Sequence, residues 1–261
     1  MNQPLAGRNI VVTRPAGQAT HLAEAIVAAG AHPVLFPVLT ISPLRDKTEL
    51  TQRLIQLDQY DLAIFISPNA VDIGLREVLA KRPWPAGLRV ATVGRSSEAA
   101  LQAHDLSGQE TQVICPSGRF DSEALLELPE LQAMDGQRII IFRGDGGREL
   151  LAETLRGRGA TVDYLSCYQR SMPDIDPAPL YRLWEAGALD AITVTSSEGL
   201  HNLVQMVGPL GLAWLRKTPL FVPHARIAAA ADAFNLHTVV VTAPADAGLM
   251  AGLLRYFSHD D

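Results

Sequence analysis

The chain carries one strand-loop-helix pattern twice, at a constant spacing of 129 residues. Aligned without gaps, residues 7–31 and 136–160 share nine identities in 25 positions. Average composition would give only about one or two identities by chance. The same spacing places Asp61–Ser67 on Asp190–Ser196. The sequence therefore predicts an internal duplication that produces two units of similar topology.

Each half of the chain contains five short apolar runs separated by helical stretches. Runs of this kind are typical of buried strands, and their regular alternation with helices predicts parallel sheets covered on both faces. We therefore expect an α/β fold with two doubly wound parallel-sheet domains. The predicted strands are Ile10–Thr13, Pro33–Phe36, Ala63–Ser67, Val90–Val93, Gln112–Cys115, Ile139–Phe142, Val162–Leu165, Ala191–Thr195, Leu220–Val222 and Thr238–Thr242.

Two proline-bounded segments, Pro37–Pro43 and Ser166–Pro173, occupy equivalent positions in the two copies. Proline fixes its own φ and pushes the preceding residue toward extended conformations, so neither segment is predicted to be helical. We interpret them as a two-segment linker between the domains. The repeat spacing alone leaves open whether the chain splits simply near residue 131 or exchanges segments between the domains.

The glycine-rich stretch Arg143–Leu155 follows a predicted strand and begins a helix, a position where α/β proteins bind anions. However, Glu149 stands where the dinucleotide fingerprint requires its third glycine, and no Gly-Lys-Ser/Thr sequence follows. A nucleotide-dependent transferase is therefore not favoured, although it stays as an alternative.

Composition narrows the class of protein further. The 261 residues are 48% hydrophobic and 19% charged, as in ordinary globular proteins, and the net charge of −6 does not favour binding to nucleic acid or to acidic membranes. Cys115 and Cys167 form no disulfide framework and no metal-ligand spacing, so we expect both to be reduced. With no apolar secretory segment at the N-terminus and no apolar run near 18 residues, we expect a cytoplasmic protein without a membrane anchor.

Small hydroxyl residues, glycines and single arginines follow most of the predicted strands. Because ligands bind at the carboxyl ends of parallel strands, these residues are expected to line a shared cleft suited to a ligand with several carboxylates. For each serine the alternative is simple helix N-capping. Asp61 and Asp190 precede strands, at the opposite edge of a sheet, and are interpreted as structural. Tyr168 is the aromatic residue expected to face the cleft, and its alternative role is linker packing.

Six short motifs occur in a fixed order along the chain: Val11–Pro15, Phe65–Val71, Val93–Ala99, Arg143–Leu151, Tyr168–Arg170 and Thr195–Leu200. In this order and spacing they resemble the uroporphyrinogen-III synthase family over essentially the whole chain. The resemblance implies an enzyme that cyclises hydroxymethylbilane, a linear tetrapyrrole, to uroporphyrinogen III, with loss of water and inversion of ring D. It implies no metal and no other cofactor. A non-catalytic two-domain binding protein for a polyanionic small molecule stays as the alternative.

The resemblance also implies domain boundaries and site residues. It implies a discontinuous first domain of residues 1–37 and 172–261, a second domain of residues 42–166, and linkers at 38–41 and 167–171. We expect the protein to be a monomer. Tyr168 matches a tyrosine that assists loss of the hydroxyl group. The substrate-binding positions implied by the family are Arg14, Ser67, Asn69, Ser97, Arg148, Ser196, Glu198 and His224. His224 and Ala225 stand where other members carry threonines.

Overall fold

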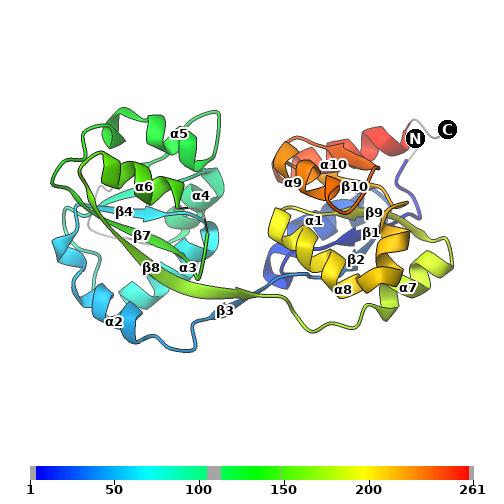
Figure 1. Ribbon diagram of the computed structural model, residues 1–261, viewed down its shortest axis with the longest axis horizontal. Coiled ribbons are helices and arrows are strands. Elements are labelled where there is room, and N and C mark those ends of the chain that lie inside the picture. The colour runs from blue at the N-terminus through cyan, green and yellow to red at the C-terminus, as the bar shows by residue number, and fades with distance from the viewer. Residues whose placement is uncertain (1–3, 105–112, 148, 259–261) are drawn as a thin grey trace. The chain divides into compact units, whose positions relative to one another are not determined.

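The computed structural model describes residues 4–104, 113–147 and 149–258. The chain divides into two compact units, residues 1–40 with 171–261 (unit 1) and residues 41–170 (unit 2). Both units are α/β, as the sequence predicts, and the strand pairs with assigned register are parallel (Figure 1).

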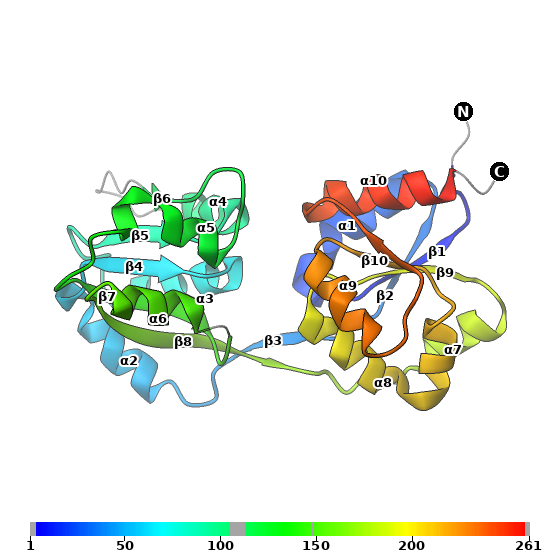
Figure 2. The ribbon, with the colours of Figure 1, turned by 45° about the horizontal axis from the view of Figure 1, so that its top comes forward.

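Unit 1 contains a sheet with the strand order β11-β10-β9-β1-β2 within the described ranges. Helices cover both of its faces (Figure 2). Ile10 and Val12 pack with α1 and α10, whereas Val11 between them packs with α7, α8 and α9. The strands are β1 (Asn9–Val12), β2 (His32–Leu35), β9 (Leu189–Thr193), β10 (Leu220–Val222) and β11 (Val239–Val241). The helices are α1 (Ala16–Ala28), α7 (Ala178–Glu185), α8 (Ser197–Leu215), α9 (Ala225–Asp232) and α10 (Ala245–Phe257).

Unit 2 contains a sheet with the order β3-β8-β7-β4-β5-β6 within the same ranges. Phe65 and Phe142 pack toward α2, α3 and α4, and Ile64 and Ile141 pack toward α5 and α6. The strands are β3 (Thr40–Pro43), β4 (Leu62–Phe65), β5 (Arg89–Thr92), β6 (Val113–Ile114), β7 (Arg138–Gly144) and β8 (Thr161–Ser171). The α-helices are α2 (Thr48–Ile55), α3 (Pro68–Leu79), α4 (Arg95–Ala103), α5 (Ser122–Glu127) and α6 (Leu150–Gly157), with short 3₁₀ helices at Leu57–Gln59 and Pro129–Leu131.

Each sheet combines strands from both copies of the repeat. In unit 1, β1 of the first copy pairs with β9 of the second, and in unit 2, β7 of the second copy pairs with β4 of the first. An equivalent hydrogen bond is present where the two copies meet in each sheet. The backbone N–H of Asn9 donates to the Asp190 carboxylate, and that of Arg138 donates to the Asp61 carboxylate, each over 2.8 Å. Both aspartates thus satisfy the first N–H of a neighbouring strand, which confirms their structural role.

The repeated glycines have a conformational reason. Gly30 and Gly159, at equivalent positions after α1 and α6, have φ values of +83° and +90°. Gly7 and Gly136, before β1 and β7, have φ values of +73° and +72°. L-residues rarely adopt this left-handed region, so both copies need glycine at these turns.

The two proline-bounded segments are extended, as predicted, but they are also strands of a sheet. Thr40–Pro43 forms β3, and β8 continues through Ser171, so that both belong to the sheet of unit 2. Pro43 lies in an edge strand, the part of a sheet to which proline is usually confined. The structure thus places Tyr168 inside a strand of unit 2, where the sequence predicted a linker residue. The predicted strand Val162–Leu165 is the beginning of β8, which extends to Ser171. The other predicted strands are observed within one or two residues, but Gln112 lies outside the described residues.

Candidate active site

The carboxyl end of β4 positions Ser67. Ser67 is the N-cap residue of α3, with Pro68 in the first helical turn, where proline lacks only a hydrogen that has no helical partner. The Ser67 Oγ accepts a hydrogen bond of 3.1 Å from the backbone N–H of Ala70. A capping hydroxyl keeps its own hydrogen and a second lone pair, so N-capping is compatible with a further contact.

That further contact is made by Tyr168. Its hydroxyl lies 3.0 Å from the Ser67 Oγ, so the structure brings two of the predicted site residues together. The Tyr168 side chain packs in the core beside α3 and is 4% exposed. Burial raises the pKa of the Tyr168 phenol above its usual value, while the hydrogen bond with Ser67 acts in the opposite direction. The phenol therefore carries its proton at neutral pH.

The other predicted residues of unit 2 lie at neighbouring helix starts. Asn69 is in the first turn of α3. Ser97 is in the first turn of α4 but is only 3% exposed, so its hydroxyl presents little surface. Arg148 lies outside the described residues.

In unit 1 the predicted residues are at the corresponding edge. Ser196, the repeat equivalent of Ser67, is the N-cap residue of α8 and accepts a hydrogen bond of 2.9 Å from Gly199 N–H. Glu198 is in the first turn of α8, and His224 is the N-cap residue of α9. Arg14 forms an ion pair with Asp246 in the first turn of α10. The capping role expected for serines at strand ends is thus confirmed for Ser67 and Ser196.

A polar cluster beside β7 was not predicted from the sequence. Glu149 accepts hydrogen bonds from Arg143 (3.0 Å) and from the Tyr164 hydroxyl (2.7 Å). The Arg143 guanidinium lies 4.1 Å from the centre of the Tyr164 ring. Sequence alternation indicated only that Tyr164 belongs to a strand, and it gave no signal for a partner fifteen residues away. The cluster fixes the start of α6 against β8.

This cluster leads to a prediction about alkaline stability. Burial and, next, the hydrogen bond to Glu149 raise the pKa of Tyr164 from 10.0 to about 12. The folded protein holds this proton more tightly than the unfolded chain, so the stabilisation is fully present below pH 10.0 and is lost as pH rises through about 12. Tyr164→Phe removes the ionisable hydroxyl. The difference in the free energy of unfolding between the parent and this variant should therefore decrease as pH rises from 10.0 to about 12. Urea unfolding of both proteins at several pH values measures it, and a difference that stays constant up to pH 12 would contradict the pKa shift.

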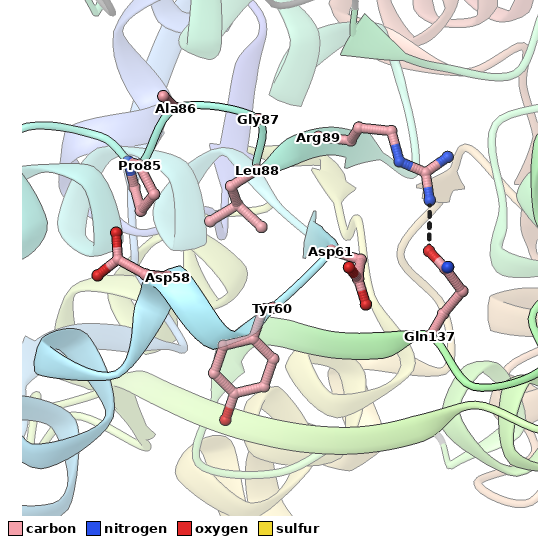
Figure 3. A pocket seen from close by; sticks show the side chains of 9 residues that line it. All are labelled: Asp58, Tyr60, Asp61, Pro85, Ala86, Gly87, Leu88, Arg89 and Gln137. Atoms are coloured by element: carbon pink, nitrogen blue, oxygen red, sulfur yellow. Dashed lines mark hydrogen bonds between the residues drawn. The ribbon is translucent and has the colours of Figure 1, made fainter.

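Unit 2 also has a cavity of about 490 Å³ at the opposite edge of its sheet (Figure 3). Asp61 precedes β4, Arg89 begins β5, and Gln137 precedes β7, so the cavity lies at the amino ends of these strands. Ser67 follows β4 at its other end, so we do not assign this cavity to the reaction. Its lining residues are Asp58, Tyr60, Asp61, Pro85, Ala86, Gly87, Leu88, Arg89 and Gln137.

Across residues 4–104, 113–147 and 149–258, no three His, Cys, Asp or Glu side chains gather into a cluster that could hold a metal ion. Within the same ranges, no helix combines the length and apolar character needed to cross a membrane.

Comparison with known proteins agrees with this fold. The family model described as uroporphyrinogen-III synthase HemD matches residues 20–251. The uroporphyrinogen-III synthase of Escherichia coli K12 is 34% identical over 240 residues, which cover 91% of this chain and 96% of that protein. The corresponding enzyme of Salmonella typhimurium is 35% identical with the same coverage.

Solved structures share the fold at lower sequence identity. A mutant uroporphyrinogen III synthase from the extremely thermophilic bacterium Thermus thermophilus aligns with a TM-score of 0.64 at 17% identity, covering 98% of this chain and 100% of that one. The uroporphyrinogen-III synthetase of Helicobacter pylori 26695 aligns with a TM-score of 0.60 at 13% identity, covering 95% and 99%. The family model covers most of the chain, and relatives above 30% identity match nearly all of it, so the chain belongs to the uroporphyrinogen-III synthase family.

Proposed function

We propose that this chain cyclises hydroxymethylbilane to uroporphyrinogen III, with Tyr168 as the proton donor to the departing hydroxyl group. Membership of the family supports the reaction. The observation that supports the role of Tyr168 is the contact between its hydroxyl and Ser67 at the start of α3. The alternative, a non-catalytic binding protein, is not favoured by the family assignment.

The hydrogen bonds around Ser67 provide a route for this chemistry. Because the Ser67 Oγ accepts from Ala70 N–H, its own hydrogen is available to the Tyr168 oxygen. In that orientation the phenol hydrogen is not used in the bond to Ser67, so it can be donated to the substrate. The carbon–oxygen bond of the substrate breaks as the phenol proton moves to the leaving oxygen, so that water departs and an azafulvene cation forms.

The phenolate left on Tyr168 accepts a hydrogen bond from Ser67, which in turn accepts one from a backbone N–H at the positive end of α3. When the last ring closes in the inverted orientation, the ring carbon that formed the new bond loses a proton. That proton restores the phenol, so the cycle consumes and produces only hydroxymethylbilane, uroporphyrinogen III and water.

Recognition of the substrate is proposed to be spread over several helix starts. Hydroxymethylbilane carries eight carboxylates, and helix N-termini supply N–H groups and a partial positive charge without a basic protein. This explains how a chain with a net charge of −6 binds a polyanion. The proposed contributors are Asn69 in unit 2 and Arg14, Ser196, Glu198 and His224 in unit 1, whereas Ser97 is too buried to present its hydroxyl to the substrate. Glu198 is suited to accept hydrogen bonds from pyrrole N–H groups.

We further propose that the protein acts as a monomer in the cytoplasm. The cysteines Cys115 and Cys167 are both free, as is usual in a reducing compartment. Gel filtration with light scattering measures the oligomeric state, and a dimeric mass would overturn the monomer.

Incubation with hydroxymethylbilane, followed by separation of the uroporphyrinogen isomers, tests the reaction. Uncatalysed closure gives isomer I, so a sample without protein is the control. We expect isomer III as the main product. Isomer I alone, at the uncatalysed rate, would leave the chain as a binding protein.

A further inference from the structure

The pairing of β7 with β8 contains an irregularity next to Tyr168. Arg143 pairs with Ser166, but the next residue, Gly144, pairs with Tyr168, so Cys167 is an extra residue on β8. A β-bulge of this kind changes the direction in which the following side chains point, and such bulges are over-represented beside active sites.

The bulge decides which face of the sheet receives the Tyr168 ring. In a regular strand successive side chains point to opposite faces, so Cys167 and Tyr168 would separate. Here Leu165, Cys167 and Tyr168 all belong to the core cluster that packs against α3, whereas Val162 and Tyr164 pack on the face of α5 and α6. The extra residue thus turns the ring toward α3 and its N-cap residue Ser67.

The absence of a side chain at Gly144 leaves the space that the Tyr168 ring occupies. A Cβ at this position would lie 2.8 Å from Cε2, 3.0 Å from Cζ and 3.3 Å from the hydroxyl oxygen of Tyr168. The first distance is shorter than real Cβ contacts, and the other two are tighter than most, so a side chain here would move the ring. The backbone of Gly144 is not in the left-handed region, so space and not φ requires glycine.

A second glycine, Gly74 of α3, allows the bulged residue Cys167 to pack closely on that helix. A Cβ on Gly74 of α3 would lie 2.8 Å from Cδ1 of Phe142 and 3.3 Å from Sγ of Cys167. The bulged residue therefore packs directly on α3, the helix that begins at Ser67. Both partners of the Ser67–Tyr168 hydrogen bond are thus connected to α3.

We propose that Gly144 is a positioning residue for Tyr168. Its missing side chain lets the ring lie against β7, with the hydroxyl 3.0 Å from Ser67 in the position for proton donation. This inference rests on the proposed role of Tyr168 in proton transfer and assigns to Gly144 no contact with the substrate.

The test is a double-mutant cycle of Gly144→Ala with Tyr168→Phe. Displacing a catalytic group by about an ångström can lower kcat by up to about 10²-fold, so we expect Gly144→Ala to lower kcat by about 10- to 10²-fold, with a smaller change in KM. In the Tyr168→Phe background no hydroxyl remains to be displaced, so adding Gly144→Ala should lower kcat no further. A structural defect would instead lower kcat in both backgrounds.

Gly157→Ala is the matched control. Gly157 is in α6 of the same unit, its φ is not left-handed, and a Cβ there would have no atom within 4 Å. We expect this variant to retain the parent kcat. Alkaline titration of tyrosinate absorbance, with Tyr168→Phe identifying the signal, should show the Tyr168 pKa moving toward its usual value in Gly144→Ala as the ring leaves its buried position.

The outcomes separate the two proposals. An unchanged rate in Tyr168→Phe would overturn the proton-donor role itself. A slow Tyr168→Phe together with a normal Gly144→Ala, or with additive effects in the double variant, would overturn only the inference about Gly144. If Gly144→Ala does not fold, the double variant Gly144→Ala/Tyr168→Ala is prepared, because it removes the ring with which the new methyl group would clash. Recovery of the fold would support the contact, and continued misfolding would overturn it.

Discussion

Replacing Tyr168 by phenylalanine is expected to lower the initial rate of uroporphyrinogen III formation by about 10²-fold or less. General acid catalysis is worth about 10²- to 10⁴-fold, and the low end applies because the pyrrole nitrogen already assists departure of the hydroxyl group. The ring remains in the core, so the fold should be intact. Some isomer III should still form, while isomer I accumulates because uncatalysed closure competes with slow turnover. The initial rate and the ratio of isomers I and III measure both effects.

Tyr256→Phe, a substitution of a tyrosine in α10 of unit 1, is the matched control and should leave rate and isomer ratio unchanged. An unchanged rate in Tyr168→Phe would leave Tyr168 with a packing role alone. A folded Tyr168→Phe variant that forms only isomer I would show that the hydroxyl also governs ring inversion.

Phe142→Ala is expected to lower the free energy of unfolding of unit 2 by about 3–5 kcal/mol, the usual cost of removing a buried phenylalanine ring. Phe142 is fully buried, and its ring centroid lies 4.4 Å from that of Phe65 in a stacked arrangement. It also lies in the path of any side chain at Gly74, so the cavity would open beside α3. We therefore expect activity to fall as well, because Ser67 begins that helix.

Urea unfolding followed by tryptophan fluorescence measures this effect, since Trp84 lies in the same aromatic cluster as Phe142. Phe120→Ala is the control. Phe120 is 40% exposed, and its contact with the Arg95 guanidinium, 5.3 Å from the ring centre, is worth about 0.5–1 kcal/mol at an exposed site. Equal losses of stability in the two variants would show that Phe142 does not anchor the core.

Local signals in the sequence determined the elements and the helix starts. The duplication, the alternation of strands and helices, and the capping serines Ser67 and Ser196 all follow from patterns within a few residues. The left-handed turns at Gly30 and Gly159 are local features of the same kind, because such a turn after a helix depends on the backbone of one residue. These features need no knowledge of distant contacts.

Apart from the family resemblance, only the tertiary structure decided which strands share a sheet. The hydrogen bond from Asn9 N–H to Asp190 and the one from Arg138 N–H to Asp61 join opposite copies of the repeat. A simple split would instead pair β1 with β4 and β7 with β9, each pair within one copy of the repeat. The sequence leaves both arrangements open because equivalent strands offer the same local hydrogen-bonding groups and the same apolar faces.

The orientation of Tyr168 was decided in the same way. Regular alternation along β8 places Tyr168 on the face opposite Cys167, and nothing in Ser166–Ser171 signals that one residue is left out of the pairing. The direction of the ring depends on the register against β7 and on the space above Gly144, which is 24 residues earlier in the chain. The sequence by itself therefore determined the elements and the candidate residues, and only long-range packing decided how Tyr168 reaches Ser67.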